Sequence, residues 1–429
     1  MESVKTLIVG AGITGLATAA ALSDAGDTDY LVLESDTAIG GWCKTVKKDG
    51  FVWDYSGHFF HFKHPEIEKY LRDRMTGQRI RVVNKRSFVA YKGGRVDFPF
   101  QKNIHQLPQA EFIDCLHDVY FARSTDVKRG EPLPERNFKE MLLARFGASI
   151  CDKFLVPYNE KLYACDLASL DKDAMGRFFP YADLTDIVRN MKAPDNASYN
   201  ATFTYPEGGA IEYVNAIASA VRPDGVALGE GLVAVDLARK VARTTRREIR
   251  FDRLVSSAPF NRFVAMCALE HDPAVWTWNK VLVFNLGFDG KGQKDVHWVY
   301  YPDRETVFYR AGWYDNIFDT DRLSLYVEIG FPKEAPLGDD RLRALRDRVL
   351  TDLGREGVVT GQRLVAEHSV VLDPAYVHIT KASLAEHARL AAVLERHGVW
   401  SLGRYGRWTY CAIEDNIVEA RALVSRWIS

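Results

Sequence analysis

The sequence predicts a mixed α/β fold, and three features of its 429 residues carry that prediction. A strand–helix–strand unit with a glycine-rich turn occupies residues 5–41, a helical pattern fills much of residues 105–200, and aromatic strands dominate residues 263–390. A unit of the first kind is typical of a Rossmann-like nucleotide-binding domain. The other two segments predict an inserted helical domain and an antiparallel β-sheet domain.

The first strand is expected at the apolar run Leu7-Ile8-Val9, which breaks at Gly10. Gly10 permits a tight turn, and Gly12 lets the backbone approach a pyrophosphate. Gly15 lets the following helix, expected at residues 14–25, pack closely on the strand. The first N–H groups of that helix then point at the phosphates.

A second strand is expected at residues 30–33, and it ends in Glu34, where a carboxylate can bond a ribose hydroxyl. An ordinary glycine-rich turn would not need these flanking elements in this order, so the unit predicts a dinucleotide site. A signal peptide is not expected, because glycines interrupt the apolar run and no basic cluster precedes it. The pair Gly40-Gly41 resembles the flavoprotein form of the motif seen in amine oxidases and desaturases, so we expect FAD. Its expected contacts here are Gly10, Gly12, Ile13, Thr14, Gly15, Glu34, Ser35, Gly40, Gly41 and Trp42.

The composition excludes several function classes. Lysine and arginine number 56 and aspartate and glutamate 57, so no overall charge favours nucleic acid or an anionic membrane. The hydrophobic fraction of 47% is that of a globular protein, and no apolar stretch is long enough to span a bilayer. Six cysteines without a C-x-x-C pair suit the reduced thiols of a cytoplasmic protein. The sequence leaves both a monomer and a homo-oligomer open.

Further elements follow the cofactor unit. Strands are expected at residues 79–100, with Gly93-Gly94 as a hairpin turn, and again near Phe203, before a helix at residues 211–221. A basic stretch at residues 239–250 is interpreted as a solvated hairpin, because no aromatic residue is interleaved for stacking on nucleic acid.

The C-terminal half alternates between sheet and cofactor domain. Strands are expected from residue 281 to 371 with one helix at residues 339–353, and then a strand, Gly403 and a helix at residues 415–427. The FAD-binding domain is thus expected to comprise residues 1–78, 201–262 and 391–429. The sheet domain is expected at residues 79–104 and 263–390, and the helical domain at residues 105–200.

Three histidines, His58, His61 and His64, invite interpretation as a metal site. On a strand His58 and His64 would face one side and His61 the other, so the three rings would not converge. No metal site is therefore expected.

Five short segments resemble the UDP-galactopyranose mutases, and they occur in that family's order along the chain. They are Gly57-His58, Phe98-Pro99-Phe100-Gln101-Lys102-Asn103-Ile104, Pro157-Tyr158-Asn159-Glu160-Lys161-Leu162-Tyr163, Phe308-Tyr309-Arg310, and the stretch from Gly403 to Tyr410.

The resemblance implies an enzyme that interconverts pyranose and furanose forms of a nucleotide-diphosphate sugar without net redox. The N5 atom of reduced FAD would be the nucleophile on the anomeric carbon, and NAD(P)H or another reductant would activate the flavin. The resemblance gives catalytic roles to His58, Arg310 and Tyr410. It adds cofactor contacts from Gly57, His58, Gly403, Arg404, Asp415, Asn416 and Ile417. Its substrate contacts are Phe98, Gln101, Asn103, Tyr158, Asn159, Lys161, Tyr309, Arg310, Arg407 and Tyr410.

Three departures leave the nucleotide and the sugar open. Val156 stands where eukaryotic mutases have a second diphosphate-binding arginine, Phe98 replaces a tyrosine, and Thr409 replaces a basic residue. Two other hypotheses also stay open. One is an FAD-dependent oxidoreductase of the amine oxidase or desaturase type, and the other is a non-catalytic FAD-binding scaffold.

Overall fold

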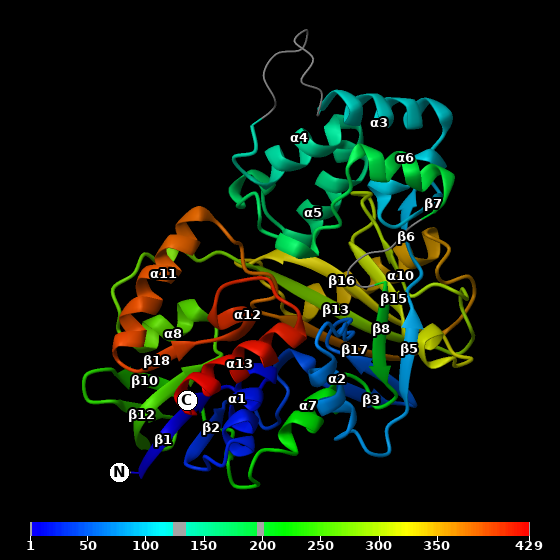
Figure 1. Cartoon of the computed structure of the whole chain (residues 1–429). Coiled ribbons are helices and arrows are strands. Elements are labelled where there is room, and N and C mark those ends of the chain that lie inside the picture. Colours follow the sequence, from blue (N-terminus) through cyan, green and yellow to red (C-terminus); the bar gives the residue numbers. More distant parts are fainter. Residues whose placement is uncertain (1, 123–133, 195–200, 429) are drawn as a thin grey trace.

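The computed structural model describes residues 2–122, 134–194 and 201–428, and it contains two large sheets with a helical layer above one of them (Figure 1). Within these ranges no helix is both long and apolar enough to cross a membrane. Parts of the expected helical domain, residues 123–133 and 195–200, lie outside the described residues.

The first sheet is mostly parallel and is assembled from widely separated segments of the chain. Its seven strands follow the order β10-β11-β12-β1-β2-β9, and β18 pairs with β12. The strands are β1 (Glu2–Val9), β2 (Tyr30–Glu34), β9 (Val226–Leu228), β10 (Leu232–Asp236), β11 (Val241–Thr244), β12 (Glu248–Ser256) and β18 (Val399–Ser401). The expected basic hairpin is confirmed as β10–β11–β12, the antiparallel edge of this sheet.

Helix α1 (Ile13–Asp24) follows β1 directly and is almost wholly buried. It packs between α13 (Ile413–Ile428) and α7 (Ile211–Ala218), so the first and last helices of the chain touch. Its first turn carries no acidic residue, which leaves the positive end of the helix dipole uncompensated by the chain.

The second sheet has the order β17-β13-β16-β15-β14-β6-β7 and is antiparallel except between β6 and β14. Its strands are β6 (Ser87–Tyr91), β7 (Gly94–Asp97), β13 (Asn279–Phe288), β14 (Trp298–Tyr300), β15 (Arg310–Trp313), β16 (Ser324–Pro332) and β17 (Leu364–Leu372). Along β16 the side chains alternate. Leu325 and Val327 pack with α10 (Asp339–Arg355) on one face, and Tyr326 and Glu328 lie on the other.

The helical layer comprises α3 (Gln109–Ala122), α4 (Phe138–Ile150), a π-helical turn at Cys151–Leu155, α5 (Val156–Tyr163) and α6 (Leu184–Lys192). Figure 1 shows these helices gathered at the top of the molecule, away from both termini. Helix α5 contacts β16, so it brings the helical layer against the second sheet.

Smaller elements connect these parts. The two-stranded sheets are β3 (Thr45–Lys48) with β4 (Phe51–Asp54), and β5 (Ile80–Asn84) with β8 (Thr202–Pro206). The short helices are α2 (Pro65–Arg72), α8 (Phe260–Met266), α9 (Tyr314–Phe318) and α12 (Gly403–Gly406).

Two local expectations were wrong. Residues 306–309 do not form a strand, because β15 begins only at Arg310, and α11 (Lys381–Arg396) was not foreseen in the segment assigned to the sheet domain. The hydroxyl oxygen of Thr380 caps α11 by accepting a hydrogen bond from the Ser383 N–H, so a helix-start signal is present at this position of the sequence.

Candidate active site

A cavity of about 500 Å³ opens at the glycine-rich turn between β1 and α1. It runs from Glu34, at the end of β2, to Arg404 in the C-terminal segment. Its lining includes twelve of the expected cofactor contacts: Gly10, Gly12, Ile13, Thr14, Glu34, Ser35, Gly40, Gly41, Trp42, His58, Arg404 and Asn416.

The glycines of the turn are required for different reasons. A Cβ atom on Gly15 would lie 1.8 Å from the carbonyl oxygen of Gly10, so only glycine lets the helix approach the strand. A Cβ on Gly12 would meet only the backbone of Gly41, its Cα at 3.8 Å and its N at 4.0 Å, which are ordinary contacts. The protein's own packing therefore does not require glycine at position 12, whereas a pyrophosphate passing over the turn does. This open cradle fits a bound dinucleotide.

The Glu34 carboxylate is fixed at one end of this cavity. It accepts hydrogen bonds from the backbone N–H of Ala11 at 2.8 Å and of Asp36 at 2.9 Å. These bonds tie the end of β2 to the glycine turn, and they leave the carboxylate on the cavity wall where a ribose hydroxyl can reach it.

The C-terminal segment closes the other side. Asn416 Oδ1 accepts from the Thr14 hydroxyl and from the Arg404 N–H, both at 3.0 Å. Gly403 has φ 78°, and a Cβ there would lie 2.2 Å from the Thr14 hydroxyl. The other five expected cofactor contacts do not line this cavity, and for them the expectation stays a prediction. Gly57 lines the neighbouring cavity, and Gly15, Gly403, Asp415 and Ile417 line neither.

A second cavity of about 160 Å³ adjoins the first. The two have a common wall formed by Trp42, His58, Arg404, Tyr405, Cys411 and Ile413. Three of the residues expected to act on substrate, Tyr309, Arg310 and Tyr410, line the smaller cavity. Because the two cavities adjoin at these residues, a ligand bound in one cavity would lie next to a ligand bound in the other.

Arg310 is held by a buried acid, Glu328. Arg310 Nε lies 2.6 Å from Glu328 Oε2 and Nη2 lies 2.8 Å from Oε1, a two-bond ion pair. The Ser56 hydroxyl also donates to Glu328. Burial alone would raise the pKa of Glu328, but the Arg310 charge and the hydrogen bonds from Arg310, Ser56 and Tyr309 lower it below its ordinary value. The carboxylate is therefore ionised and neutralises Arg310.

His58 lies at the boundary of the two cavities, and its Nδ1 atom is buried without a partner among the described residues. Burial lowers its pKa to about 4, with the Arg404 charge adding to the effect. The ring is therefore neutral near pH 7. His61 bonds the carbonyl of Thr202 and His64 lies beside Glu66, so these two histidines have separate partners.

Several site residues were missed by the sequence analysis. Tyr326, Tyr376 and Ser56 line the smaller cavity, and Tyr405 lies on the common wall. Glu328 does not line it, but it holds Arg310 and Ser56, which do. The available signal was Glu328 itself, a single acid in an otherwise apolar and aromatic strand. Such a position is rarely buried without a partner of opposite charge.

The expected face of Arg310 also needs correction. A strand through residues 306–310, as expected within residues 281–371, would put Arg310 on the same face as Phe308. In the structure Tyr309 and Arg310 both line the cavity, while Phe308 packs in the core beneath α10. The alternation fails because residues 306–309 are not in a strand.

Seven residues expected to bind substrate line neither cavity here, and most have other partners. The Gln101 amide donates to Pro180, Asn103 to Pro99, and Asn159 to Leu155, in each case to the backbone carbonyl. Rings of Phe98 and Tyr158 both contact Tyr300, and Arg407 pairs with Glu419 at 2.6 Å. Their role in substrate binding stays a prediction.

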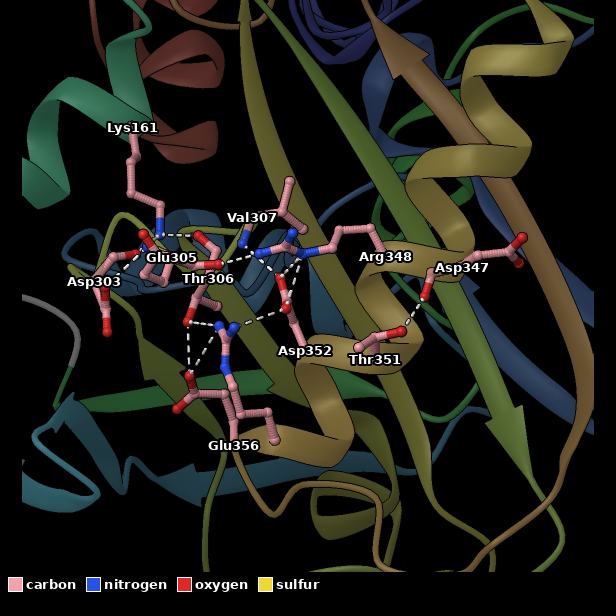
Figure 2. A network of polar contacts seen from close by, with 11 residues as sticks. Lys161, Asp303, Glu305, Thr306, Val307, Asp347, Arg348, Thr351, Asp352 and Glu356 are labelled. Carbon is pink, nitrogen blue, oxygen red and sulfur yellow. Dashed lines mark hydrogen bonds and ion pairs between the residues drawn. The ribbon is translucent and has the colours of Figure 1, made fainter.

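Lys161, the seventh of these residues, points away from both cavities. Its ammonium donates to the carbonyl oxygens of Tyr301, Asp303 and Thr306 at 2.7, 2.8 and 2.7 Å. Figure 2 shows this ammonium on one side of the turn, with Asp352 and Arg348 of α10 on the other. Lys161 thus anchors α5 to the turn that leads into Tyr309 and Arg310.

The comparisons with known proteins agree with this geometry. The family described as flavin containing amine oxidoreductase matches residues 13–281. Protoporphyrinogen oxidase 2 of Arabidopsis thaliana is 24% identical over 193 residues, which are 44% of this chain and 37% of that protein. The match thus spans little more than a third of that relative's length.

Two solved structures resemble the whole chain. A reduced UDP-galactopyranose mutase superposes with a TM-score of 0.89 at 24% identity, covering 99% of this chain and 96% of that one. A cyclohexylamine oxidase from Brevibacterium oxydans superposes with a TM-score of 0.67 at 16% identity, covering 99% and 98%. These likenesses establish the expected α/β architecture, an FAD-binding fold with an added β-sheet domain.

Proposed function

The chain belongs to the flavin containing amine oxidoreductase family, and from that premise we propose that it is a flavin-dependent mutase of nucleotide-diphosphate sugars. The observation that carries the proposal is the smaller cavity beside the cofactor cavity, which bears the Arg310 guanidinium among tyrosines and has Arg404 on the wall that it has in common with the cofactor cavity. Guanidinium groups grip phosphate oxygens, and tyrosines supply hydroxyls and ring faces for a sugar. The likeness to a reduced UDP-galactopyranose mutase supports the same substrate class.

Reduced flavin, when bound, supplies the nucleophile for the anomeric carbon, and the chain's own residues supply binding and electrostatics. Arg310 donates hydrogen bonds from Nε and Nη2 to the Glu328 carboxylate, so its guanidinium is held in position before substrate binds. Its charge would stabilise the diphosphate that leaves the sugar. Fixed charges of this kind cost no reorganisation during the reaction.

Tyr410 lines the same smaller cavity as Arg310. Its ring stacks on the ring of Tyr376, with 5.7 Å between the ring centroids. Its hydroxyl can donate to a diphosphate oxygen. Neutral His58 is placed to orient groups on both sides of the common wall rather than to carry a charge. Val156 is buried at the start of α5, so a second diphosphate contact would come from another residue.

The test is incubation of dithionite-reduced protein with a panel of UDP-, GDP- and dTDP-sugars, followed by separation of pyranose and furanose isomers. Isomer formation by the reduced protein but not by the oxidised protein is expected. Tyr410→Phe serves as the matched variant, because it removes one hydroxyl and keeps the ring stack. If the reduced protein forms no pyranose or furanose isomer from any sugar of the panel, the proposal is wrong.

An FAD-dependent oxidoreductase of the amine oxidase type is the second candidate, favoured by the family match and by the Arabidopsis thaliana relative. It would consume one equivalent of oxidant or reductant for each product. The mutase would need NAD(P)H or another reductant only to activate the flavin. The third hypothesis, a non-catalytic scaffold, expects no clustering, whereas His58, Arg310 and Tyr410 line one cavity.

A further inference from the structure

Arg404 carries a charge that the fold does not neutralise. Its Nη2 donates to the carbonyl of Ala375 at 3.3 Å, and its buried Nε has no partner among the described residues. Its guanidinium carbon lies 5.0, 5.8 and 4.6 Å from the ring centres of Tyr376, Tyr405 and Tyr410. Ring faces attract a cation weakly, and they do not cancel its charge.

No carboxylate of the described chain lies within 4.0 Å of Arg404, in contrast to the other arginines near the site. Arg310 pairs with Glu328 and Arg407 pairs with Glu419. Glu414 lines the same cavity and is the lining acid nearest to Arg404 in sequence. Its carboxylate accepts hydrogen bonds from the backbone N–H groups of Lys63 and His64. Holding the Arg404 charge partly out of water without a counter-ion costs free energy, and an anionic ligand bound beside it would offset that cost.

The position of Arg404 indicates which ligand this is. A dinucleotide with its ribose at Glu34 and its pyrophosphate at the Gly10–Gly15 turn must extend toward the common wall of the two cavities. Arg404 lies on that wall, which Glu34 does not line, so the flavin ring is expected beside Arg404. The ring is neutral when oxidised, and it becomes an anion when it takes up two electrons and one proton.

We propose that Arg404 is the electrostatic partner of the reduced flavin. It stabilises the anionic reduced ring over the oxidised ring, and it thereby raises the reduction potential of the bound cofactor. Dithionite supplies the two electrons while the proton comes from solvent, and NAD(P)H supplies the two electrons and the proton together as a hydride. This role goes beyond the mutase proposal, because it holds equally if the enzyme is an oxidoreductase.

The experiment measures the reduction potential of the flavin in the purified holoprotein, by anaerobic equilibration with a redox dye and without substrate. Arg404→Gln is expected to lower the ratio of reduced to oxidised flavin at a given potential at least tenfold. For a two-electron couple, this tenfold change lowers the reduction potential by about 30 mV. Arg404→Lys, which keeps the charge, is expected to restore most of the shift. Arg389→Gln removes the same charge from an exposed position on α11 and should leave the potential unchanged.

If Arg404→Gln purifies without flavin, the apoprotein is titrated with oxidised and with dithionite-reduced FAD. The ratio of the two dissociation constants reports the same preference, and the variant should lose affinity mainly for the reduced form. An unchanged potential, or an equal loss of affinity for both forms, would overturn the proposal. Because no nucleotide sugar is present, failure here is distinct from failure of the mutase function.

Discussion

The Arg310 guanidinium and the Glu328 carboxylate form a two-bond ion pair, 2.6 and 2.8 Å long, across two paired strands of the second sheet. The two residues are direct register partners in β15 and β16, and Glu328 is fully buried. The pair fixes the orientation of the guanidinium that, in the proposed function, stabilises the departing diphosphate. A carboxylate that already holds two of its nitrogens makes Arg310 a rigid contact rather than a flexible one.

Replacement of Arg310 should therefore weaken turnover strongly. Arg310→Ala is expected to lose about 3 kcal/mol of transition-state stabilisation, roughly a hundredfold in rate, because the departing diphosphate loses a fixed charge. Arg310→Lys should recover only part of this loss, since a lysine cannot make the same two parallel bonds. Turnover and free-nucleotide affinity are measured in each variant, with the flavin spectrum as a check on the cofactor.

The matched control is Arg343→Ala, which removes an exposed arginine of α10 from the opposite face of the same sheet. It should behave as wild type. Near-wild-type turnover in Arg310→Ala would place the diphosphate elsewhere. A loss of fold is checked separately, because an unpaired Glu328 in the core can cost about 3–5 kcal/mol of stability.

The glycines of the N-terminal turn should respond differently to substitution. Gly12→Arg is expected to leave the protein folded but colourless, because its side chain would occupy the space of the pyrophosphate while its Cβ meets no close neighbour. Gly15→Ala should instead impair folding, since its Cβ would lie 1.8 Å from the Gly10 carbonyl oxygen. Flavin absorbance and thermal unfolding distinguish the two effects. A yellow Gly12→Arg variant would move the cofactor away from this turn.

The cofactor end of the site could be predicted from sequence because it is local. The β1 strand, Gly10, Gly12 and Glu34 lie within one strand–helix–strand unit, so their spacing alone places them together. Glu328 could not be placed in the same way, because its contact with Arg310 depends on the pairing of β15 with β16. Sheet register is a long-range property that a single sequence does not reveal.

Lys161 shows why a short motif does not decide the direction of a long side chain. Its motif resembles a substrate-binding segment, yet a long side chain on α5 can turn either toward the cavity or toward the sheet domain. Here it turns toward three backbone carbonyls of the turn at residues 301–306. Helix α5 also lies so close to β16 that a Cβ on Gly330 would be 2.2 Å from the Lys161 carbonyl oxygen. Lys161 therefore makes a structural contact here, and its role in substrate binding stays a prediction.

From this geometry we expect Lys161→Met to lower stability and to spare nucleotide affinity. The substitution leaves carbonyl oxygens without their donor, and each such loss costs about 1–3 kcal/mol. The free energy of unfolding in urea and the affinity for free nucleotide are measured together. Lys192→Met, on α6, provides the same chemical change away from the turn. Unchanged stability with weakened nucleotide binding would restore Lys161 to the substrate site.

Stability should also depend on pH through Asp54. Burial raises the pKa of Asp54 to about 7, against an ordinary value of 3.8, despite hydrogen bonds from Thr45, Tyr205 and the Ala210 N–H. Between these values the folded state holds a proton that the unfolded state has released, so this contribution to stability falls as pH rises toward and through 7. Below about pH 4 the contribution is fully present.

Asp54→Asn removes that titration. Its free energy of unfolding, relative to wild type, is expected to improve as pH rises from about 4 to 7 and to change little outside that range. Urea unfolding at a series of pH values measures the difference. Parallel profiles for the two proteins would show that the Asp54 carboxylate is already ionised in the fold.

The most direct test of the account counts reducing equivalents against products with a nucleotide sugar that the protein converts. The holoprotein is reduced once with dithionite under anaerobic conditions, excess reductant is removed, and isomer formation is followed while the flavin spectrum is recorded. The account predicts many products for each reduced flavin, with the flavin still reduced at the end and no activity in the oxidised protein. One NAD(P)H or one O₂ consumed for each product would contradict it and would assign the chain to the oxidoreductases.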